Sequence, residues 1–457
     1  MPQIIFDKSS LSSVKGMDHL TYGGPPSKNF NRSRNSYFGP SWIPQTNESG
    51  RKRKARNEFL TKIPILETGI PKRIEIGSPV RLGTYSVEIN LEKKIHKYLP
   101  DRSQLKPCIY NPRMIAKYDL LAGYSAKYDW GNGDNYMDML LEWIEDNKEK
   151  VFLPSTASSS SPSSTTATTG QTTTTIPATI KPRLEADFVT SRGVITKIMV
   201  APFERRGWVL AATKINGTIF MTARSNTGGE TRGTEYHNIL CYSGLKFENL
   251  MTTPRQEEVY ESLKRGEYGQ FCCVMKIRMG RHNLLYAAEM DSMVKRSDAS
   301  MPIEDIEFME IKTCGLIRNR ASYNYFCARK APKWWSQCLL GDADKVLCGF
   351  RDELLVVRSI SRIEKKDLIT MNKNWSPQKC AAFLDKFLSF VKHNMDQEGI
   401  TLQFICAPSK NMVYAKQSTF DVNMPSWFVN KYHVKARPHT GFRRLETKND
   451  TFPLTGW

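Results

Sequence analysis

Two short segments carry charged residues at a spacing that could do chemistry. Glu289 and Asp291 lie two residues apart in the run LLYAAEMD, and Glu310 and Lys312 lie two residues apart in FMEIKT. Residues two apart in a β-strand point to the same face, so each pair would present its side chains together. Such pairs are more often the polar side of an amphipathic strand, but the first run opens with an apolar stretch and looks buried. Two buried carboxylates need a counter-charge, and a divalent cation is the natural one.

An Asp followed, after a spacer, by Glu-x-Lys is also the minimal pattern of nucleases that hydrolyse phosphodiesters with magnesium. Hard carboxylate oxygens bind the metal, which lowers the pKa of bound water. The ammonium of Lys312 would orient that water or stabilise charge that develops on the phosphate. The pattern alone is weakly specific. Other catalytic templates are absent from the sequence: it has no GxSxG, no GxxxxGK[ST], and Gly131 and Gly133 lack the third glycine of a dinucleotide fingerprint.

The elements that must position these residues are strands interleaved with helices. Asn216 and Gly217, between WVLAATKI and TIFMTA, predict a hairpin because both residues tolerate the positive φ of a type I′ turn. Apolar residues at helical spacing predict one helix around Met137 to Ile144, and Ser376 with Pro377 predicts the start of another. Strands are predicted as strand, turn, strand over 74–90 and, singly, from Phe271, Leu284, Phe308, Val346, Leu354 and Thr401. This alternation predicts a mixed sheet flanked by helices.

The chain has 457 residues, with 66 Lys and Arg against 46 Asp and Glu, so its formal net charge of +20 favours an anionic partner. That partner would be nucleic acid or an acidic membrane surface. No stretch approaches the roughly 20 apolar residues of a membrane span, and residues 1–10 lack the apolar core of a secretory signal. We therefore expect an intracellular protein without a membrane partner. The scattered cysteines and histidines indicate no zinc site.

Composition also divides the chain. Residues 1–70 are predicted to be a disordered basic arm, and its run RKRKAR (51–56) indicates a nuclear-import signal, a solvated tail or a non-specific RNA contact. Residues 71–440 would form one catalytic domain, and 441–457 a C-terminal tail. The Ser/Thr-rich stretch 154–182 cannot bury enough apolar surface to order itself and is predicted to be a disordered insertion in that domain.

Seven motifs, in order over roughly residues 77–432, resemble those of the DXO family of decapping nucleases. They are DFVTSRG around Arg192, GLKFE ending at Glu248, AEMD at 288–291, MEIKT at 309–313, KWWSQCLL around Gln337, GFRDE at 349–353 and MPSWFV around Trp427. The resemblance implies an α/β (α+β) fold. Its mixed central sheet would be joined by a second, smaller antiparallel sheet, with helices around a core of the Asp/Glu-x-Lys nuclease type.

The resemblance also implies roles for single residues. Glu248, Asp291, Glu310 and the main-chain carbonyl of Ile311 would bind the metal, which would be Mg²⁺ or alternatively Mn²⁺, with two ions present when substrate is bound. Glu289, Asp291, Glu310 and Lys312 would be catalytic, with Glu289 acting through a metal-bound water or the substrate. Arg192, Lys312 and Gln337 would contact RNA phosphates, and Cys272 would line the substrate channel. A buried cysteine in an apolar strand, however, usually only packs.

Two positions depart from the family pattern. Ser191 stands where an aromatic residue is expected before Arg192, and Pro332 must begin or kink the helix that carries Gln337. Trp334 and Trp335 fit core positions better than base stacking.

The activity implied by the resemblance is metal-dependent hydrolysis at single-stranded RNA 5′ ends. The enzyme would remove NAD caps, incomplete caps and 5′-triphosphate ends, and would degrade RNA from 5′ to 3′. We expect it in the nucleus, with the cytoplasm as an alternative, and a nuclear 5′–3′ exoribonuclease is a candidate partner. A catalytically inactive RNA-binding scaffold remains an alternative, as does a DNA nuclease of the same Glu-x-Lys type if the resemblance is set aside.

Overall fold

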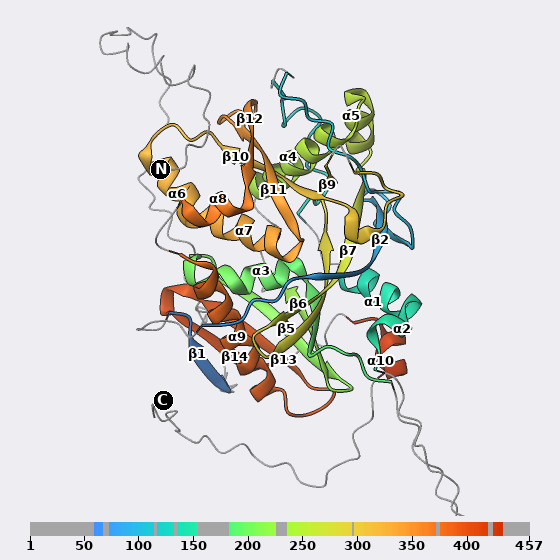
Figure 1. Cartoon of the computed structure of the whole chain (residues 1–457), viewed down its shortest axis with the longest axis vertical. Helices are drawn as coiled ribbons and strands as arrows, with labels where there is room; N and C mark the ends of the chain where they lie inside the picture. The colour runs from blue at the N-terminus through green and yellow to red at the C-terminus, as the bar shows by residue number, and fades with distance from the viewer. Residues whose placement is uncertain are drawn as a thin grey trace, which may run out of the picture. The chain divides into compact units, whose positions relative to one another are not determined.

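A computed structural model describes residues 59–66, 73–113, 117–131, 136–153, 182–224, 235–294, 297–371, 375–418 and 424–432 (Figure 1). The basic run at 51–56, residues 154–181 of the Ser/Thr-rich stretch and the tail at 441–457 lie outside the described residues. The predictions made for them therefore stay predictions.

The described residues form two sheets, and the larger has ten strands in the order β1-β14-β13-β5-β6-β4-β8-β7-β2-β3. Its short strand β4 runs parallel to both of its neighbours, β6 and β8, whereas every other neighbouring pair is antiparallel. The sheet is therefore mixed, as predicted. The strands are β1 (Thr61–Pro64), β2 (Val80–Asn90), β3 (Ile95–Leu99), β4 (Phe188–Ser191), β5 (Trp208–Ile215), β6 (Thr218–Arg224), β7 (Glu267–Met279), β8 (His282–Glu289), β13 (Thr401–Ala407) and β14 (Met412–Gln417).

The smaller sheet has four strands in the order β12-β11-β10-β9. They are β9 (Ser292–Met293), β10 (Phe308–Gly315), β11 (Ala343–Arg351) and β12 (Val357–Glu364). The prediction of a purely antiparallel sheet is wrong, because β10 and β11 are parallel. A helical crossover between these two strands, at 320–340, brings the chain back to the starting edge, as parallel neighbours require.

The ten α-helices named here cover both sheets (Figure 1). They are α1 (Tyr136–Asp146), α2 (Lys148–Val151), α3 (Arg192–Val200), α4 (Glu235–Thr252), α5 (Gln256–Lys264), α6 (Arg320–Tyr325), α7 (Ala331–Leu340), α8 (Lys365–Thr370), α9 (Pro377–Asn394) and α10 (Ser426–Tyr432). A π-helical turn, Phe326–Lys330, links α6 to α7.

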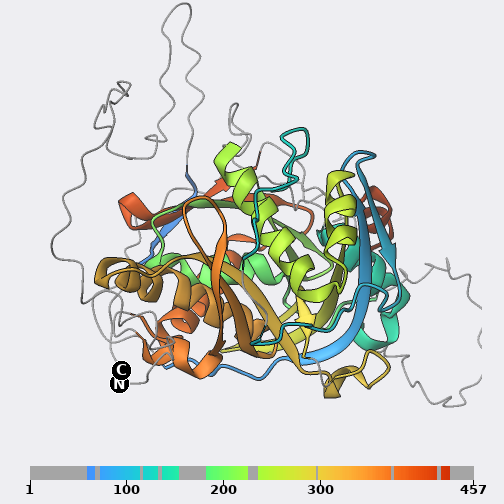
Figure 2. The same ribbon diagram turned by 90° about the horizontal axis from the view of Figure 1, so that it is seen from above.

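The smaller sheet is covered on both faces. Along β11, Val346 and Cys348 belong to the core that contains α7, whereas Leu347 packs with residues of α4. Because successive strand residues point to opposite faces, α7 and α4 lie on opposite sides of this sheet (Figure 2). Helix α3 packs beside α7, where Ser336 and Thr196 hydroxyls are 3.3 Å apart.

Several predicted elements are confirmed. Asn216 (φ 48°) and Gly217 (φ 81°) form the turn between β5 and β6, with the positive φ values of a type I′ turn. Ser376 caps α9, since its hydroxyl accepts a hydrogen bond of 3.2 Å from the backbone N–H of Lys379. The helix expected around Met137 to Ile144 is α1, whose apolar residues are buried.

Other boundaries differ from prediction. The N-terminal arm was predicted to reach residue 70, but β1 pairs with β14 at the sheet edge and Ile65 is buried. Pro64 is tolerated there because an edge strand has one unpaired side. The two strands expected over 74–90 are one isolated bridge at Ile76 followed by the single strand β2. The strand expected from Leu354 begins only at Val357, because 352–355 form the turn after β11.

Candidate active site

Glu310 and Lys312 lie on one face of β10, as their spacing predicts, and Lys312 contacts both Glu310 and Asp291. The Lys312 Nζ lies 2.6 Å from Glu310 Oε2 and 2.5 Å from Asp291 Oδ2. The same Asp291 oxygen accepts a hydrogen bond of 2.7 Å from the backbone N–H of Ile311. The side chains of Asp291 and Glu310 are only 4% and 1% exposed. The lysine therefore bridges two buried carboxylates.

Asp291 lies between two strands and not within one, which differs from the prediction. Strand β8 was expected to run through Asp291, but it ends at Glu289. The chain then leaves the larger sheet and enters β9 of the smaller one at Ser292. Asp291 thus lies at the crossover between the two sheets, directly opposite the strand that holds Glu310 and Lys312.

Arg192 is the first residue of α3 and forms an ion pair with Glu310. Strand β4 delivers it beside β8, since Ser191 pairs with Ala287. Ser191 then caps the helix, because its hydroxyl accepts a hydrogen bond of 3.4 Å from the backbone N–H of Val194. The residue that departs from the family pattern thus starts the helix that holds the arginine.

Glu248 comes from α4, on the other side of the smaller sheet from α7. The helix is fixed by buried polar contacts to the 119–122 segment: Lys246 donates to the Asp119 carbonyl at 2.7 Å, and the Tyr242 hydroxyl donates to the Ala122 carbonyl at 2.8 Å. Glu248 lies close enough to Asp291, Lys312 and Glu289 for their charges to act on it. The structure therefore brings this third predicted ligand to the same cluster.

Glu289 and Cys272 are paired across β8 and β7 and share a face of the larger sheet. Cys272 is fully buried, and burial, with the nearby Glu289 charge, raises the pKa of its thiol. These observations fit the packing role for Cys272. Its expected contact with substrate stays a prediction.

The carboxylates differ in their affinity for protons. Burial raises the pKa of Glu289 to about 7, and the neighbouring Asp291 charge adds to the effect. Burial and the Asp291 charge likewise raise the pKa of Glu248. For Glu310, burial acts in the same direction, but Arg192 and Lys312 outweigh it and hold the pKa below its ordinary value. Burial and the Glu310 charge also raise the pKa of Asp291, so among these four acids only Glu310 has enough positive charge around it to lower its pKa.

This arrangement fits a divalent cation in two respects. The Oε2 of Glu310 is buried and lies beside the Lys312 ammonium, but it has no hydrogen bond of proper geometry, so a lone pair is available. Burial and the Asp291 charge outweigh the nearby cations at Glu248 and Glu289, so their raised pKa values indicate a cluster in which a further positive charge would be favourable. Within the described residues, no three His, Cys, Asp or Glu side chains already stand at metal-binding distances. Lys312 occupies the space between Asp291 and Glu310 instead.

Gln337 lies on α7, half-buried, next to Arg192. Gly341, which follows α7, lies against both residues. A Cβ at this position would be 3.0 Å from Arg192 Nη1 and 3.1 Å from the Gln337 carbonyl oxygen. Pro332 lies in the first turn of α7, directly after the π-helical turn, as expected for a helix start. Trp334 and Trp335 are both buried, which confirms their core positions.

Two residues near the site were not found from the sequence. Ser191 acts as a helix cap, for which the signal was its place before an apolar helical run. Lys333 lies four residues before Gln337, a spacing that puts both on one helix face. The charges of Lys312 and Lys197 act on Lys333, so it lies near the carboxylate cluster.

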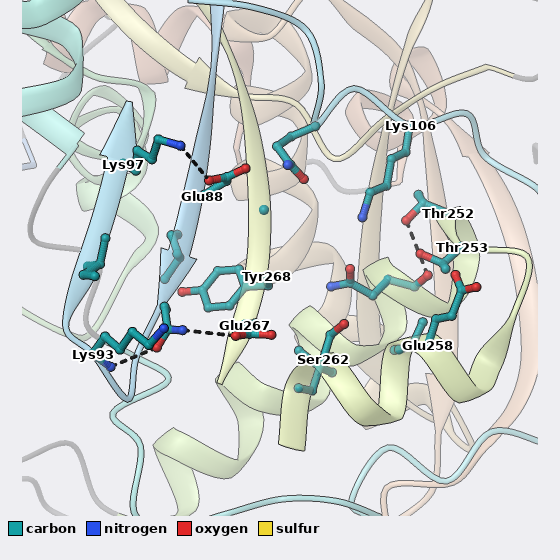
Figure 3. Close-up of a pocket in the computed structure, with 18 of the residues that line it drawn as sticks. Glu88, Lys93, Lys97, Lys106, Thr252, Thr253, Glu258, Ser262, Glu267 and Tyr268 are labelled. Atoms are coloured by element: carbon teal, nitrogen blue, oxygen red, sulfur yellow. Dashed lines mark hydrogen bonds and ion pairs between the residues drawn. The ribbon is translucent and has the colours of Figure 1, made fainter. Parts of the chain in front are cut away.

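A separate cavity of about 780 Å³ lies between β2, β3 and β7 on one side and α4 and α5 on the other (Figure 3). Glu88 and Glu267 line it, from the face of the larger sheet opposite to Cys272. Lys106 also lines it, and burial lowers the pKa of this lysine. None of the predicted site residues lines this cavity, so it is distinct from the carboxylate cluster.

The fold and site together define an α/β protein with a buried Asp, Glu-x-Lys cluster where two sheets meet. Residues 77–429 match the family model described as RAI1 like PD-(D/E)XK nuclease. The chain therefore belongs to the RAI1-like PD-(D/E)XK nuclease family, and the predicted fold class and hydrolase class are confirmed.

Curated relatives agree with this family. A decapping and exoribonuclease protein from Xenopus laevis is 26% identical over 373 residues, which cover 77% of this chain and 85% of the relative. The Homo sapiens protein of the same name is 28% identical over 221 residues, or 46% of this chain, and there the chain spans 55% of the relative's length.

Solved structures share the fold. Candida albicans Rai1 in complex with pU5-Mn²⁺ has a TM-score of 0.57 at 16% identity and covers 78% of this chain and 93% of its own. Scheffersomyces stipitis Rai1 in complex with (3′-NADP)⁺ and calcium ion has a TM-score of 0.58 at 16% identity and covers 82% and 97%. Among the described residues of this chain, no helix has the length and apolarity needed to span a membrane.

Proposed function

We propose that this protein is a metal-dependent hydrolase of RNA 5′ ends. It removes NAD caps, incomplete caps and 5′-triphosphate ends and then degrades the RNA from 5′ to 3′. The observation that carries the proposal is the contact of Lys312 with both Asp291 and Glu310, beside Arg192, in a chain of this nuclease family. The ligands of the similar Rai1 structures, pU5 with Mn²⁺ and (3′-NADP)⁺ with calcium, support RNA and NAD-type substrates.

Different residues of the chain would bind the metal and the RNA phosphates. Glu248, Asp291, Glu310 and the carbonyl of Ile311 would hold Mg²⁺, or alternatively Mn²⁺, as two ions when substrate is bound. Divalent ions so placed lower the pKa of water and neutralise the attacking and leaving oxygens. Arg192 and Gln337 would bind phosphate oxygens.

Lys312 and Glu289 would act nearer the reacting bond. Lys312 would shift from its carboxylates toward the charge that develops on the phosphate. Glu289, with a pKa of about 7, would accept a proton at its carboxylate near neutral pH.

The bond that breaks follows from the use of one carboxylate cluster for both activities. Water would attack the phosphodiester between the first and second transcribed nucleotides, whatever is attached upstream. For NAD-capped RNA the first nucleotide is the adenosine of NAD. The products would be intact NAD and a 5′-monophosphate RNA, which the same site can shorten further.

Mass analysis of the small product tests this proposal. Wild-type protein incubated with NAD-capped RNA and magnesium should release NAD, whereas Asp291→Asn, which lacks a metal ligand, should release none. Nicotinamide mononucleotide as the main product would instead indicate cleavage of the pyrophosphate within the cap. RNA binding without any product, in magnesium and in manganese, would favour the inactive scaffold.

Location and partners are further parts of the proposal. The basic run at 51–56 supports nuclear import, with the cytoplasm as the alternative. A nuclear 5′–3′ exoribonuclease is the partner that we propose, because it would consume a 5′-monophosphate RNA product.

A further inference from the structure

A row of three polar residues, two of them lysines, continues outward from the carboxylate cluster at α7. Lys330 directly precedes α7, and Lys333 and Gln337 follow it at i+3 and i+7, so the three share a helix face. Lys333 is exposed and the other two are half-buried, although Trp334, which neighbours Lys330 at i+4, is buried in the core. The row therefore lies at the edge of the core-packed side of the helix, and Lys333 is its exposed member.

The inner end of the row meets the catalytic cluster. At the C-terminal end of α7, Gly341 approaches the guanidinium of Arg192, and the charges of Glu310, Lys312 and Arg192 all act on Cys338. Lys333 lies one turn before Gln337 on α7, and the charge of Lys312 acts on it.

Lys330, at the outer end of the row, lies near the part of β10 that follows Lys312. Lys330 acts on Cys314, which lies two residues beyond Lys312 on β10. Positive charge thus extends from Lys312 to Lys333 and Lys330.

The row is arranged for an anion that the described part of the protein does not supply. Among the described residues, neither Lys330 nor Lys333 has a carboxylate within ion-pair distance. Partial desolvation of Lys333, together with the charges of Lys330 and Lys197 from the adjacent α3, lowers its pKa to about 8. Glu204 opposes this effect only in part. Binding of a phosphate beside Lys333 would relieve the repulsion among these ammonium groups.

We propose that Lys330 and Lys333, flanked by Lys197, bind the phosphates of the RNA chain on the 3′ side of the bond that is cut. This inference rests on the proposed function. Three ammonium groups, from α3 and from the start of α7, can contact more than one phosphate of a repeating polyanion, whereas the cap offers only one short pyrophosphate group. The row would hold the RNA body in place while the 5′ end reaches the carboxylates.

The test is RNA binding in the Asp291→Asn background, where no cleavage occurs. Lys333→Gln and Lys330→Gln should each weaken binding of a single-stranded RNA of about twenty nucleotides, roughly tenfold for Lys333→Gln. Each should make the slope of log affinity against log salt less negative by about 0.7, the value for one phosphate contact on a single strand. A 5′-phosphorylated dinucleotide should bind as before, because it does not reach the row.

Lys62→Gln is the matched control. Lys62 is exposed on β1, at the edge of the larger sheet, and five strands separate β1 from β8. Equal behaviour of Lys333→Gln and Lys62→Gln, with wild-type binding intact, would overturn the row but leave the proposed function standing. So would an equal loss for dinucleotide and long RNA, and a loss confined to NAD-capped RNA would assign the row to the cap. No RNA binding by any variant would instead remove the proposed function.

Discussion

The buried carboxylates of the site repel one another, and their pKa values respond differently to that repulsion. Glu310 stays ionised because Arg192 and Lys312 both contact it. Burial raises the proton affinity of Glu289, although the charges of Arg192 and Lys312 oppose this effect. The cluster therefore holds negative charge that is stabilised on one side and poorly stabilised on the other, which is how a site for an incoming cation differs from a structural ion pair.

Glu289 should make the metal-free protein less stable as pH rises. Its pKa of about 7 in the folded state exceeds the ordinary glutamate value of 4.5, so the folded state binds the proton more tightly than the unfolded state. The folded protein is then at no disadvantage below pH 4.5 and loses up to about 3 kcal/mol as pH rises through 7. Thermal unfolding in a chelator should show Glu289→Gln gaining stability over wild type between pH 5 and pH 8.

The control for this effect is the pH dependence of the difference, because Glu289→Gln removes one titrating group and keeps the side-chain shape. A stability difference that stays constant from pH 5 to pH 8 would mean that Glu289 is already ionised in the folded protein.

Much of the residue-level geometry followed from spacing. The Glu-x-Lys pair faces one way because β10 is a regular strand, as expected for positions two apart. The contact between Arg192 and Glu310 could not be found that way, since 118 residues separate them. Only the resemblance to a known family placed Arg192 and Glu248 beside the acids before the structure did.

Arg192 and Asp291 are positioned by the ends of two neighbouring strands, β4 and β8. Strands β4 and β8 run parallel, and at their C-terminal ends the chain turns into α3 and into β9. Glu289 and Asp291 keep the spacing of one strand face, so nothing in LLYAAEMD indicates that the strand stops at Glu289. Tertiary pairing decides that boundary, because Ser292 and Met293 find hydrogen-bonding partners in β10 rather than in the larger sheet.

Ser191 should matter for stability through α3 alone. Ser191→Ala removes the side-chain acceptor at the N-terminus of this helix, which costs about 0.5–1 kcal/mol given the 3.4 Å length of the bond. Calorimetry should show a melting temperature lower by about 1–3 °C. Ser191→Asn, which keeps a capping oxygen, should melt close to wild type. Equal losses in both variants would indicate that the residue acts through packing in β4 instead.

At the scale of the whole molecule, the site forms where the chain passes from β8 of the larger sheet to β9 of the smaller sheet. The larger sheet supplies Glu289, and α3, which follows its strand β4, supplies Arg192. The smaller sheet supplies Glu310 and Lys312, and Asp291 lies on the link. Helix α4 closes the cluster with Glu248 from the far face of the smaller sheet. Any change that separates the sheets would therefore disperse the acids before it altered any single one of them.

The long Ser/Thr-rich insertion is expected to leave this arrangement unaffected. Its two ends are already held together, since the Leu153 N–H donates to the Arg183 carbonyl at 2.8 Å and the Glu185 N–H donates to the Val151 carbonyl at 2.8 Å. Replacing residues 155–180 with a short Gly/Ser turn should therefore keep both contacts. Because closure entropy grows only with the logarithm of loop length, the free energy of unfolding should change by no more than about 1 kcal/mol, toward greater stability.

Melting temperature and RNA hydrolysis rate, measured on the deletion variant and the full chain, check this expectation. Both should agree closely, and a replacement turn of scrambled polar sequence serves as the control for the turn itself. A drop of many degrees, with either turn, would mean that the insertion packs on the folded part of the chain. A normal melting temperature with slower hydrolysis of long RNA would mean that the insertion contributes to substrate binding, although its composition predicts neither.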